Sequence, residues 1–188
     1  MNVVRDTTGQ WINHIFNDPT VKPFIIDDER YLDLGKIASD PKGYCIIGEP
    51  PFGAYVLWPI VDGVYEFHVG VLPQGRGQWA VDFSAATIDY MFCATDAIEL
   101  ITRIPQGSLP SLALARHFAL HERWRCPAIR FRGRTVPYTV LSVTLFDWIP
   151  SDDEARNAFL SRMHQMGMEK KATAWYQRWA LLSPQEKQ

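Results

Sequence analysis

The chain has 188 residues and a formal net charge of −2; 47% of its residues are hydrophobic and 21% are charged. This length suits one domain with a sizeable core, and the composition is that of a soluble globular protein. The small net charge gives no general attraction to nucleic acid or to a membrane surface. No apolar run reaches the roughly 18–20 residues that cross a bilayer.

The start of the chain, MNVVRDTTGQW, has no basic region followed by an apolar stretch, so we expect no signal peptide. Cys45, Cys93 and Cys126 are odd in number and widely spaced. They predict reduced thiols in a cytoplasmic protein. His117 and His121 share a helical spacing, but no third ligand is near in the sequence, and we therefore expect no metal site.

The first predicted elements are a helix and three strands. The helix spans residues 8–17, stops at Asp18-Pro19 and carries on one face Trp11, Ile12 and Ile15. The strand-like runs lie at residues 44–48, 54–60 and 64–72. Asp62-Gly63 between the last two is a strong hairpin signal, so these runs predict three consecutive antiparallel strands.

The periodicity then changes and predicts a crossover. A spacing of four, three and four residues marks an amphipathic helix over 80–93, with its apolar face made by Val81, Ala85, Ile88 and Phe92. Alternation predicts a strand over 96–104, with one face made by Ile98, Leu100, Thr102 and Ile104. Strands 64–72 and 96–104 are joined by a helix and should therefore be parallel, which gives a mixed α/β sheet.

The second half adds a helix, two strands and a helical segment. Ser108 and Pro110 favour a helix start, and the inner side of this helix is made by Leu112, Ala115 and Phe118. Residues 129–148 read as two strands that break near Gly133 or Pro137. We expect one domain over residues 1–150 and a C-terminal helical extension, 151–188, packed on it.

The extension itself contains two predicted helices. Residues 151–154 form a capping box that opens the first, and Gly167 separates it from the last. Trp175 and Trp179 lie one turn apart on the last helix. They either dock this helix on the body or, if exposed, mark a protein interface.

The most specific stretch is residues 70–92, GVLPQGRGQWAVDFSAATIDYMF, where a strand ends and a helix begins at once. Two glycines flank Arg76, an arrangement that places backbone amides around a phosphate. Trp79 brings a bulky side chain into this turn. It either rotates into the core and leaves the amides available, or lies across the cleft and plugs it.

The element order, with VGVLPQGRGQWAV and IPQGSLPSLALARHFAL as motifs, resembles the GNAT superfamily of acyl-CoA-dependent N-acetyltransferases over most of residues 8–148. NDPTVKPFI, GVYEFHVGVLPQGRG and ITRIPQGSLPSLALARHFAL look most like divergent GNAT-like proteins of tailed bacteriophages. The resemblance implies a GNAT-like α/β fold, in which a mixed antiparallel and parallel sheet is flanked by helices.

The resemblance also implies an acetyl-CoA site, with the pyrophosphate on the loop amides and the pantetheine arm on a strand edge exposed by a bulge in strand 64–72. The implied cofactor-binding residues are Val69, Val71, Leu72, Gly75, Arg76, Gly77, Gln78, Trp79, Ala80, Ser108 and Ser111. Arg76 either contacts phosphate or is a solvated loop residue. Trp79 takes the place of a family glycine unless Gly75 or Gly77 fills that role, and Ala115 takes the place of a tyrosine that protonates the leaving thiolate.

Glu66 and His68 share one face of the strand that leads into the loop, opposite Phe67 and Val69. Either side chain suits the general base that takes a proton from the substrate amine, and the charge of histidine changes near neutral pH. The alternative is a polar outer face of a half-exposed strand. A bulge would reverse which residues face the cleft.

Five arginines cluster in twelve residues: Arg123, Arg125, Arg130, Arg132 and Arg134. A spacing of two places the last three on one strand face. They form a solvated basic edge, a docking stripe for an acidic protein or nucleic-acid backbone, or a contact to the 3′-phosphate of CoA.

Two functional hypotheses follow. The first is an acyl-CoA-dependent N-acetyltransferase of phage type, acting on a small-molecule or protein amine. The second is a GNAT-fold protein without catalysis that acts as a virion-associated or host-interaction protein, through the arginines or the C-terminal tryptophans. We expect a protein of the host cytoplasm or the virion, with no membrane partner.

Overall fold

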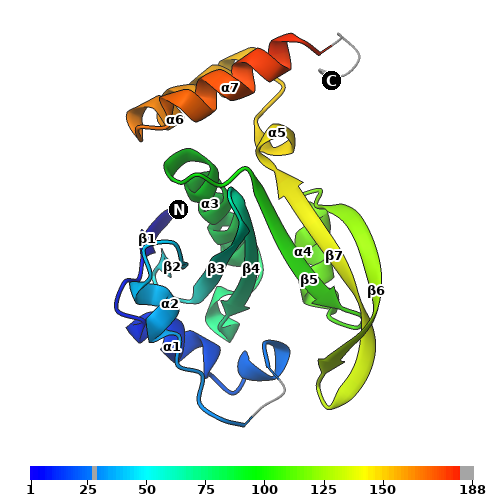
Figure 1. The fold of residues 1–188 in the computed structure, drawn as a ribbon. Coiled ribbons are helices and arrows are strands. Elements are labelled where there is room, and N and C mark those ends of the chain that lie inside the picture. Colours follow the sequence, from blue (N-terminus) through cyan, green and yellow to red (C-terminus); the bar gives the residue numbers. More distant parts are fainter. Residues whose placement is uncertain (27–28, 183–188) are drawn as a thin grey trace.

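The computed structural model describes residues 1–26 and 29–182. One sheet runs through it in the strand order β1-β2-β3-β4-β5-β7-β6 (Figure 1). The strands are β1 (Asn2–Arg5), β2 (Tyr44–Glu49), β3 (Gly53–Val61), β4 (Val64–Val71), β5 (Glu99–Pro105), β6 (His121–Phe131) and β7 (Arg134–Thr144). β4 and β5 are parallel and the other neighbouring strands are antiparallel, which confirms the predicted mixed sheet.

Helices cover both faces of this sheet. They are α1 (Gln10–Phe16), η1 (Lys22–Phe24), α2 (Gly35–Ser39), η2 (Pro73–Gly75), α3 (Gln78–Ala94), α4 (Leu109–His117), α5 (Leu145–Trp148), α6 (Asp153–Gln165) and α7 (Glu169–Ala180). Phe83, Ile88 and Phe92 of α3 pack with Tyr55 and Phe67 on one side of the sheet. Val81 and Ala85, predicted on the same apolar face, are only half-buried. Ile12 and Ile15 of α1 pack with Val56 on the other. The sheet is therefore buried on two sides, as expected for an α/β protein.

The predicted strands and crossover are confirmed, with three differences of detail. The alternation in β5 buries Leu100, Thr102 and Ile104, but Ile98 precedes the strand and is 50% exposed. In α1 the buried side chains include Phe16, whereas Trp11 is 42% exposed. β1 was not predicted, because a four-residue edge strand carries too short a pattern to detect.

The two strands predicted over 129–148 form a longer hairpin than expected. β6 begins at His121, and the chain turns at Arg132-Gly133, while Pro137 lies inside β7. This overturns the expected arginine stripe, because Arg132 belongs to the turn. Arg134 starts the opposite strand, where it pairs with Phe131.

The C-terminal helices α6 and α7 lie at the top of Figure 1, across the end of α3. Phe159, Met163 and Trp175 belong to the same apolar cluster as the buried residues of α3. The cap of α6 is Asp152, which accepts a hydrogen bond from the Ala155 amide, and not Ser151. Gly167, at φ +78°, separates the two helices as predicted. Among the described residues, no helix is both long and apolar enough to cross a membrane.

The two tryptophans of α7 dock this helix on the body. Trp175 is 6% exposed and stacks on Trp179 at 6.0 Å between ring centroids, and Arg156 lies over the Trp179 ring. The docking alternative is thus confirmed for Trp175. The remaining residues of the predicted extension, 183–188, lie outside the described part of the chain.

Because of Lys171 in α7, the free energy of unfolding should change with pH in the alkaline range. Its Nζ donates to the Phe92 and Thr95 carbonyl oxygens at the end of α3, at 2.8 and 3.0 Å. Burial lowers the pKa of Lys171 from 10.5 to about 8. Between these values the unfolded chain binds the extra proton, so the free energy of unfolding should rise with pH, by on the order of 2–3 kcal/mol.

This rise is measured by urea unfolding between pH 8 and 10.5. Lys171→Met should abolish it, whereas Lys170→Met, which removes an exposed charge next to it, should keep it. Equal rises in the two variants would contradict the assignment.

Candidate functional site

The site begins where β4 and β5 separate. The two strands pair only from Val64 opposite Glu99 to Glu66 opposite Ile101. Beyond this point β4 continues to pair with β3 and β5 with β7. The facing edges of His68–Val71 and Thr102–Pro105 therefore diverge, and their backbone groups are available to a ligand. The register of β4 on β3 shifts only between Pro59 and Val61, where the extra residue belongs to β3, so the bulge implied in strand 64–72 is not there.

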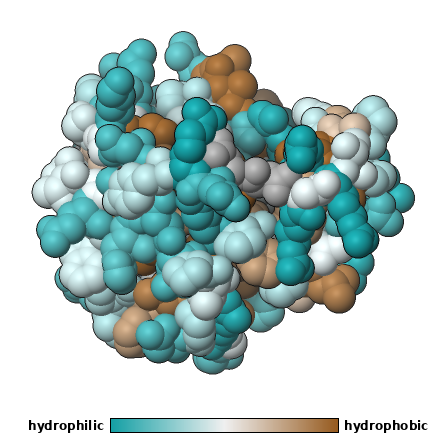
Figure 2. Space-filling model, turned by 90° about the horizontal axis from the view of Figure 1, so that it is seen from below, coloured by the Kyte–Doolittle hydropathy of each residue, from teal (hydrophilic) through white to brown (hydrophobic). Residues whose placement is uncertain are grey.

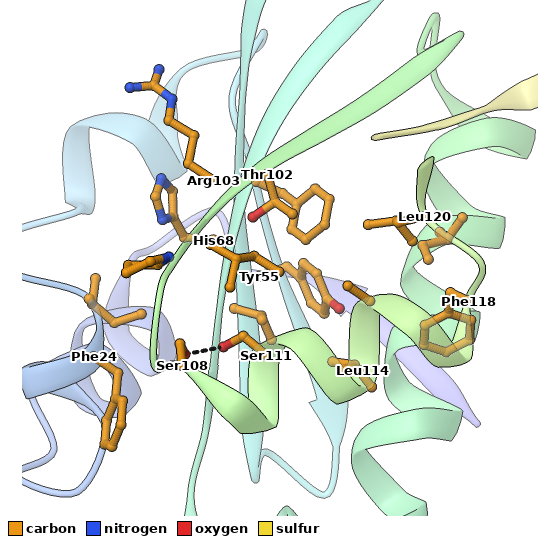
Figure 3. A pocket seen from close by; sticks show the side chains of 17 residues that line it. Phe24, Tyr55, His68, Thr102, Arg103, Ser108, Ser111, Leu114, Phe118 and Leu120 are labelled. Carbon is orange, nitrogen blue, oxygen red and sulfur yellow. Dashed lines mark hydrogen bonds between the residues drawn. The ribbon is translucent and has the colours of Figure 1, made fainter. Parts of the chain in front are cut away.

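A cavity of about 70 Å³ lies in this divergence, and we call it the α4-side cavity. Its walls come from both strands and α4, and they include Phe67, His68, Val69, Thr102, Arg103, Ser108, Ser111, Leu114 and Ala115. Figure 3 shows Ser108 and Ser111 facing each other at the start of α4, across the cavity from Thr102 and Arg103. Their hydroxyl oxygens are 2.9 Å apart, so Ser108 bonds to Ser111 and does not cap the helix with its side chain.

A second cavity of about 260 Å³ adjoins the first on the side of the β6–β7 hairpin, and we call it the hairpin-side cavity. Its further lining residues are Trp58, Glu66, Ile129, Arg130 and Phe131. Both cavities are lined by Phe24, Ile25, His68, Arg103 and Pro105. From below, onto the ends of β4 and β5, the surface is mostly hydrophilic with separate hydrophobic patches (Figure 2). His68 is among the residues that line both cavities.

Four side chains form a polar cluster at the point of divergence. Glu66 is 3% exposed. Its Oε2 accepts a hydrogen bond from Arg103 Nη2 at 2.6 Å, and its Oε1 lies 3.5 Å from His68 Nε2. Trp58 stacks on the imidazole of His68, with 4.9 Å between ring centroids and 18° between planes. Because Trp58 pairs with Glu66 and Val56 with His68, the β3–β4 register creates this stack.

The carboxyl group of Glu66 is held ionised. Burial alone would raise its pKa, but the hydrogen bond from His68 and the charges of Arg103 and His68 outweigh burial and lower this pKa below 4.5. A carboxylate whose two oxygens are already engaged by Arg103 and His68 is a weak proton acceptor. The geometry therefore makes His68 the better general base and Glu66 the group that orients it.

The start of α3 presents free backbone amides. Gly77 is the N-terminal cap of α3 and has φ +82° and ψ −137°, a backbone conformation that glycine adopts far more readily than other residues. A Cβ at this position would meet nothing within 4 Å. Within the described residues, the amides of Gly77, Gln78 and Trp79 donate to no acceptor. Arg76 beside them is exposed and donates to the Thr20 carbonyl oxygen at 3.3 Å. This is an anion-binding arrangement of the kind found at helix N-termini.

Trp79 rotates into the core and does not cross the cleft. Its indole lies in a slot between three glycines, where an added Cβ would come within 2.7 Å at Gly48, 2.9 Å at Gly53 and 2.8 Å at Gly75. It also contacts Phe83 at 4.9 Å between ring centroids. Since Trp79 lines neither cavity, the first of the two predicted orientations holds.

Trp79→Ala should destabilise the protein by about 3 kcal/mol or more, because the surrounding glycines have no side chains to refill the slot. Urea unfolding measures this loss. The control Trp11→Ala removes a half-exposed tryptophan and should cost far less. The folded Trp79 variant should still bind acetyl-CoA, and loss of binding without loss of stability would contradict this position of the indole.

The predicted cofactor residues do not all lie in one place. Val69, Ser108 and Ser111 line the α4-side cavity, and Arg76, Gly77 and Gln78 are exposed at the start of α3. The side chains of Leu72 and Trp79 turn into the core and Gly75 is buried, so any contact these residues make to a cofactor is through the backbone. Val71 and Ala80 are half-buried beside them.

The predicted partner-binding arginines are spread over the hairpin. Arg123 binds Ser142 and Glu99, and Arg125 binds Glu122 on the same strand. Arg130 lines the hairpin-side cavity, and Arg132 lies over the Phe24 ring. Arg103 and Trp58 are functional candidates that the sequence did not reveal, although the alternation in β5 does place Arg103 opposite its buried face.

No protein-family model and no curated protein sequence matches the chain. Solved structures do. Spermidine N-acetyltransferase from Vibrio cholerae, in complex with CoA and spermine, matches with a TM-score of 0.66 and 12% identity, over 79% of this chain and 98% of that one. Ribosomal-protein-S5-alanine acetyltransferase from Vibrio fischeri matches with a TM-score of 0.61 and 12% identity, over 79% of this chain and 94% of that one.

A GNAT-family acetyltransferase from Bacillus anthracis matches with a TM-score of 0.58 and 14% identity, over 76% of this chain and 93% of that one. These likenesses cover almost the whole of each neighbour and about three quarters or more of this chain. The chain therefore has the fold of the GNAT acetyltransferases.

Proposed function

We propose that this protein is an acyl-CoA-dependent N-acetyltransferase, with the thioester bound in the α4-side cavity and the acceptor amine in the hairpin-side cavity. The observation that carries the proposal is the position of His68. It lines both cavities, directly beyond the point where β4 and β5 diverge. A base placed there reaches an amine on one side and an acyl group on the other.

Acetyl-CoA fits the residues that are present. Gly77, with open space where a Cβ would stand, and the unpaired amides of Gln78 and Trp79 would hold its pyrophosphate, with Arg76 close by. The free edges of β4 and β5 would pair with the amides of the pantetheine arm. When bound, the cofactor supplies an acetyl group activated as a thioester.

His68 takes the proton from the acceptor amine. Its Nε2 faces Glu66, so a neutral imidazole that carries its hydrogen on Nε2 has Nδ1 as proton acceptor. Glu66 stabilises the imidazolium that forms, and the stacked Trp58 fixes the plane of the ring. The family tyrosine is replaced by the buried Ala115, and the hydroxyl groups of Ser108 and Ser111, on the wall of this cavity, would donate a hydrogen bond to the leaving thiolate.

Purified protein incubated with acetyl-CoA and a panel of amines tests the proposal. Free thiol should be released only when an acceptor amine is present, and mass spectrometry should find one acetyl group on that amine. If folded protein releases no more thiol with any of the amines than without them, the proposed acetyl transfer is contradicted.

The non-catalytic alternative rested in part on a plugged cleft, and the position of Trp79 removes that argument. The resemblance to phage proteins and a location in the host cytoplasm or virion stay predictions. Binding of a protein partner through the arginines also stays a prediction.

A further inference from the structure

We propose that the acceptor is a small amine that carries a carboxylate and an apolar group, of the α-amino-acid type, and that Arg103 binds its carboxylate. This inference rests on the proposed function and names its substrate class. It comes from the charges and rings that line the hairpin-side cavity.

The available charges in this cavity are positive. Glu66 is the one carboxylate among its described lining residues, and both of its oxygens are engaged, one by His68 and one by Arg103. It is also 3% exposed. A polyamine, which carries several positive charges, would meet no open carboxylate on these walls.

Arg103 has donors to spare. Its bond to Glu66 uses Nη2, and within the described chain Nε and Nη1 have no acceptor. The side chain is 47% exposed, so these groups are accessible from the cavity. A planar guanidinium with free N–H groups is the preferred partner of a carboxylate.

The position of Arg103 relative to His68 suits one compact ligand. Both groups are held by the same carboxylate of Glu66, each on its own oxygen, and so lie side by side. Figure 3 shows both on one side of the strands, away from Phe118 and Leu120. An amine directed to the imidazole would have a carboxylate on its neighbouring carbon close to the guanidinium.

The remaining walls are apolar and aromatic. Phe24 and Phe131 contact each other at 6.3 Å between ring centroids, which closes the cavity between η1 and the hairpin. Trp58 and Ile129 complete this surface. These walls favour an apolar side chain on the substrate, since burying one removes apolar area from water.

The test compares matched ligands: L-phenylalanine with L-phenylalaninamide, L-leucine with L-leucinamide, and spermidine. The amides keep the side chain and lose the carboxylate charge. Their amine is also less basic, so each rate is expressed per concentration of unprotonated amine. We expect kcat/KM to be about ten- to a hundredfold higher for each acid than for its amide, with spermidine acetylated more slowly still.

Arg103→Gln should bring the acid-to-amide ratio close to one. Arg178→Gln removes an exposed arginine of α7 that lines neither cavity, and it should keep the wild-type ratio. The ratio is informative because general damage to the site would slow acid and amide alike. A fall in both rates at an unchanged ratio in Arg103→Gln would overturn the role of Arg103.

Acids acetylated no faster than their amides or spermidine would overturn the substrate class. Binding of acetyl-CoA, measured by calorimetry on the same sample, separates the two levels. If acetyl-CoA binds but the acids are not preferred, the inferred substrate class is wrong and the proposed function stands. If neither binding nor turnover is found, the proposed function fails with it.

Discussion

His68→Gln should lower kcat for amine acetylation by about a hundred- to ten-thousandfold, the usual contribution of a positioned general base. Glutamine keeps a polar side chain of similar size beside Glu66 but cannot accept a proton at neutral pH. The dissociation constant of acetyl-CoA should stay close to the wild-type value, since pyrophosphate binding depends on the start of α3. Steady-state kinetics and calorimetry on the same variant measure the two effects.

The pH profile gives an independent readout of the same residue. In the wild type, kcat/KM should fall at acid pH, because a protonated imidazole cannot take the amine proton. His68→Gln should keep the part of this fall that comes from protonation of the substrate amine and lose the part that comes from the imidazole. The control is His164→Gln, an exposed histidine on α6, which should leave both rate and profile unchanged. If His68→Gln keeps the wild-type kcat, His68 is not the general base.

Gly77→Val should weaken acetyl-CoA binding by about ten- to a hundredfold. Valine at φ +82° and ψ −137° strains the backbone, and relaxation of that strain would turn the first amides of α3 away from the phosphate. Its side chain would also occupy the open space in front of Gly77, where the pyrophosphate must approach.

Gly167→Val is the matched control for this substitution. Gly167 also has a positive φ, +78°, and a Cβ there would likewise meet nothing within 4 Å, but it lies in the α6–α7 turn. This variant should lose stability from backbone strain and keep its affinity for acetyl-CoA. If Gly77→Val and Gly167→Val bind acetyl-CoA with equal affinity, the pyrophosphate does not bind at Gly77.

The sequence predicted the features that depend on local pattern. The Asp62-Gly63 turn fixes the β3–β4 hairpin, and the switch from alternation to helical spacing after Arg76 predicts the crossover to β5. The spacing of two placed Glu66 and His68 on one face, and this held because β4 carries no bulge between Glu66 and Val71. The resemblance of the loop to the GNAT motif led to the correct fold.

The composition of the polar cluster depends on contacts that a single sequence does not specify. Counting back from the hairpin turn pairs Pro59 with Glu66, yet the register shift between Pro59 and Val61 puts Trp58 there instead. Arg103 meets Glu66 because β4 and β5 are parallel with a particular stagger, which only the assembled sheet sets.

The glycine roles at the loop were also open until the packing was known. Counting from the family motif put Trp79 in the place of a glycine that approaches phosphate. In the structure Gly77 has open space in front of it at the start of α3, and we propose that the phosphate approaches there. Gly75, with Gly48 and Gly53, makes room for the indole. Three glycines from separate segments form that slot, so a local pattern does not reveal it.

A calorimetric titration of the wild-type protein with acetyl-CoA tests the central claim most directly. The geometry of Gly77 and of the diverging strands predicts a single site per chain, with a dissociation constant between about 1 μM and 1 mM, the range of typical KM values. Absence of a binding heat up to about 1 mM acetyl-CoA would contradict a functional cofactor site, and with it the proposed acetyltransferase.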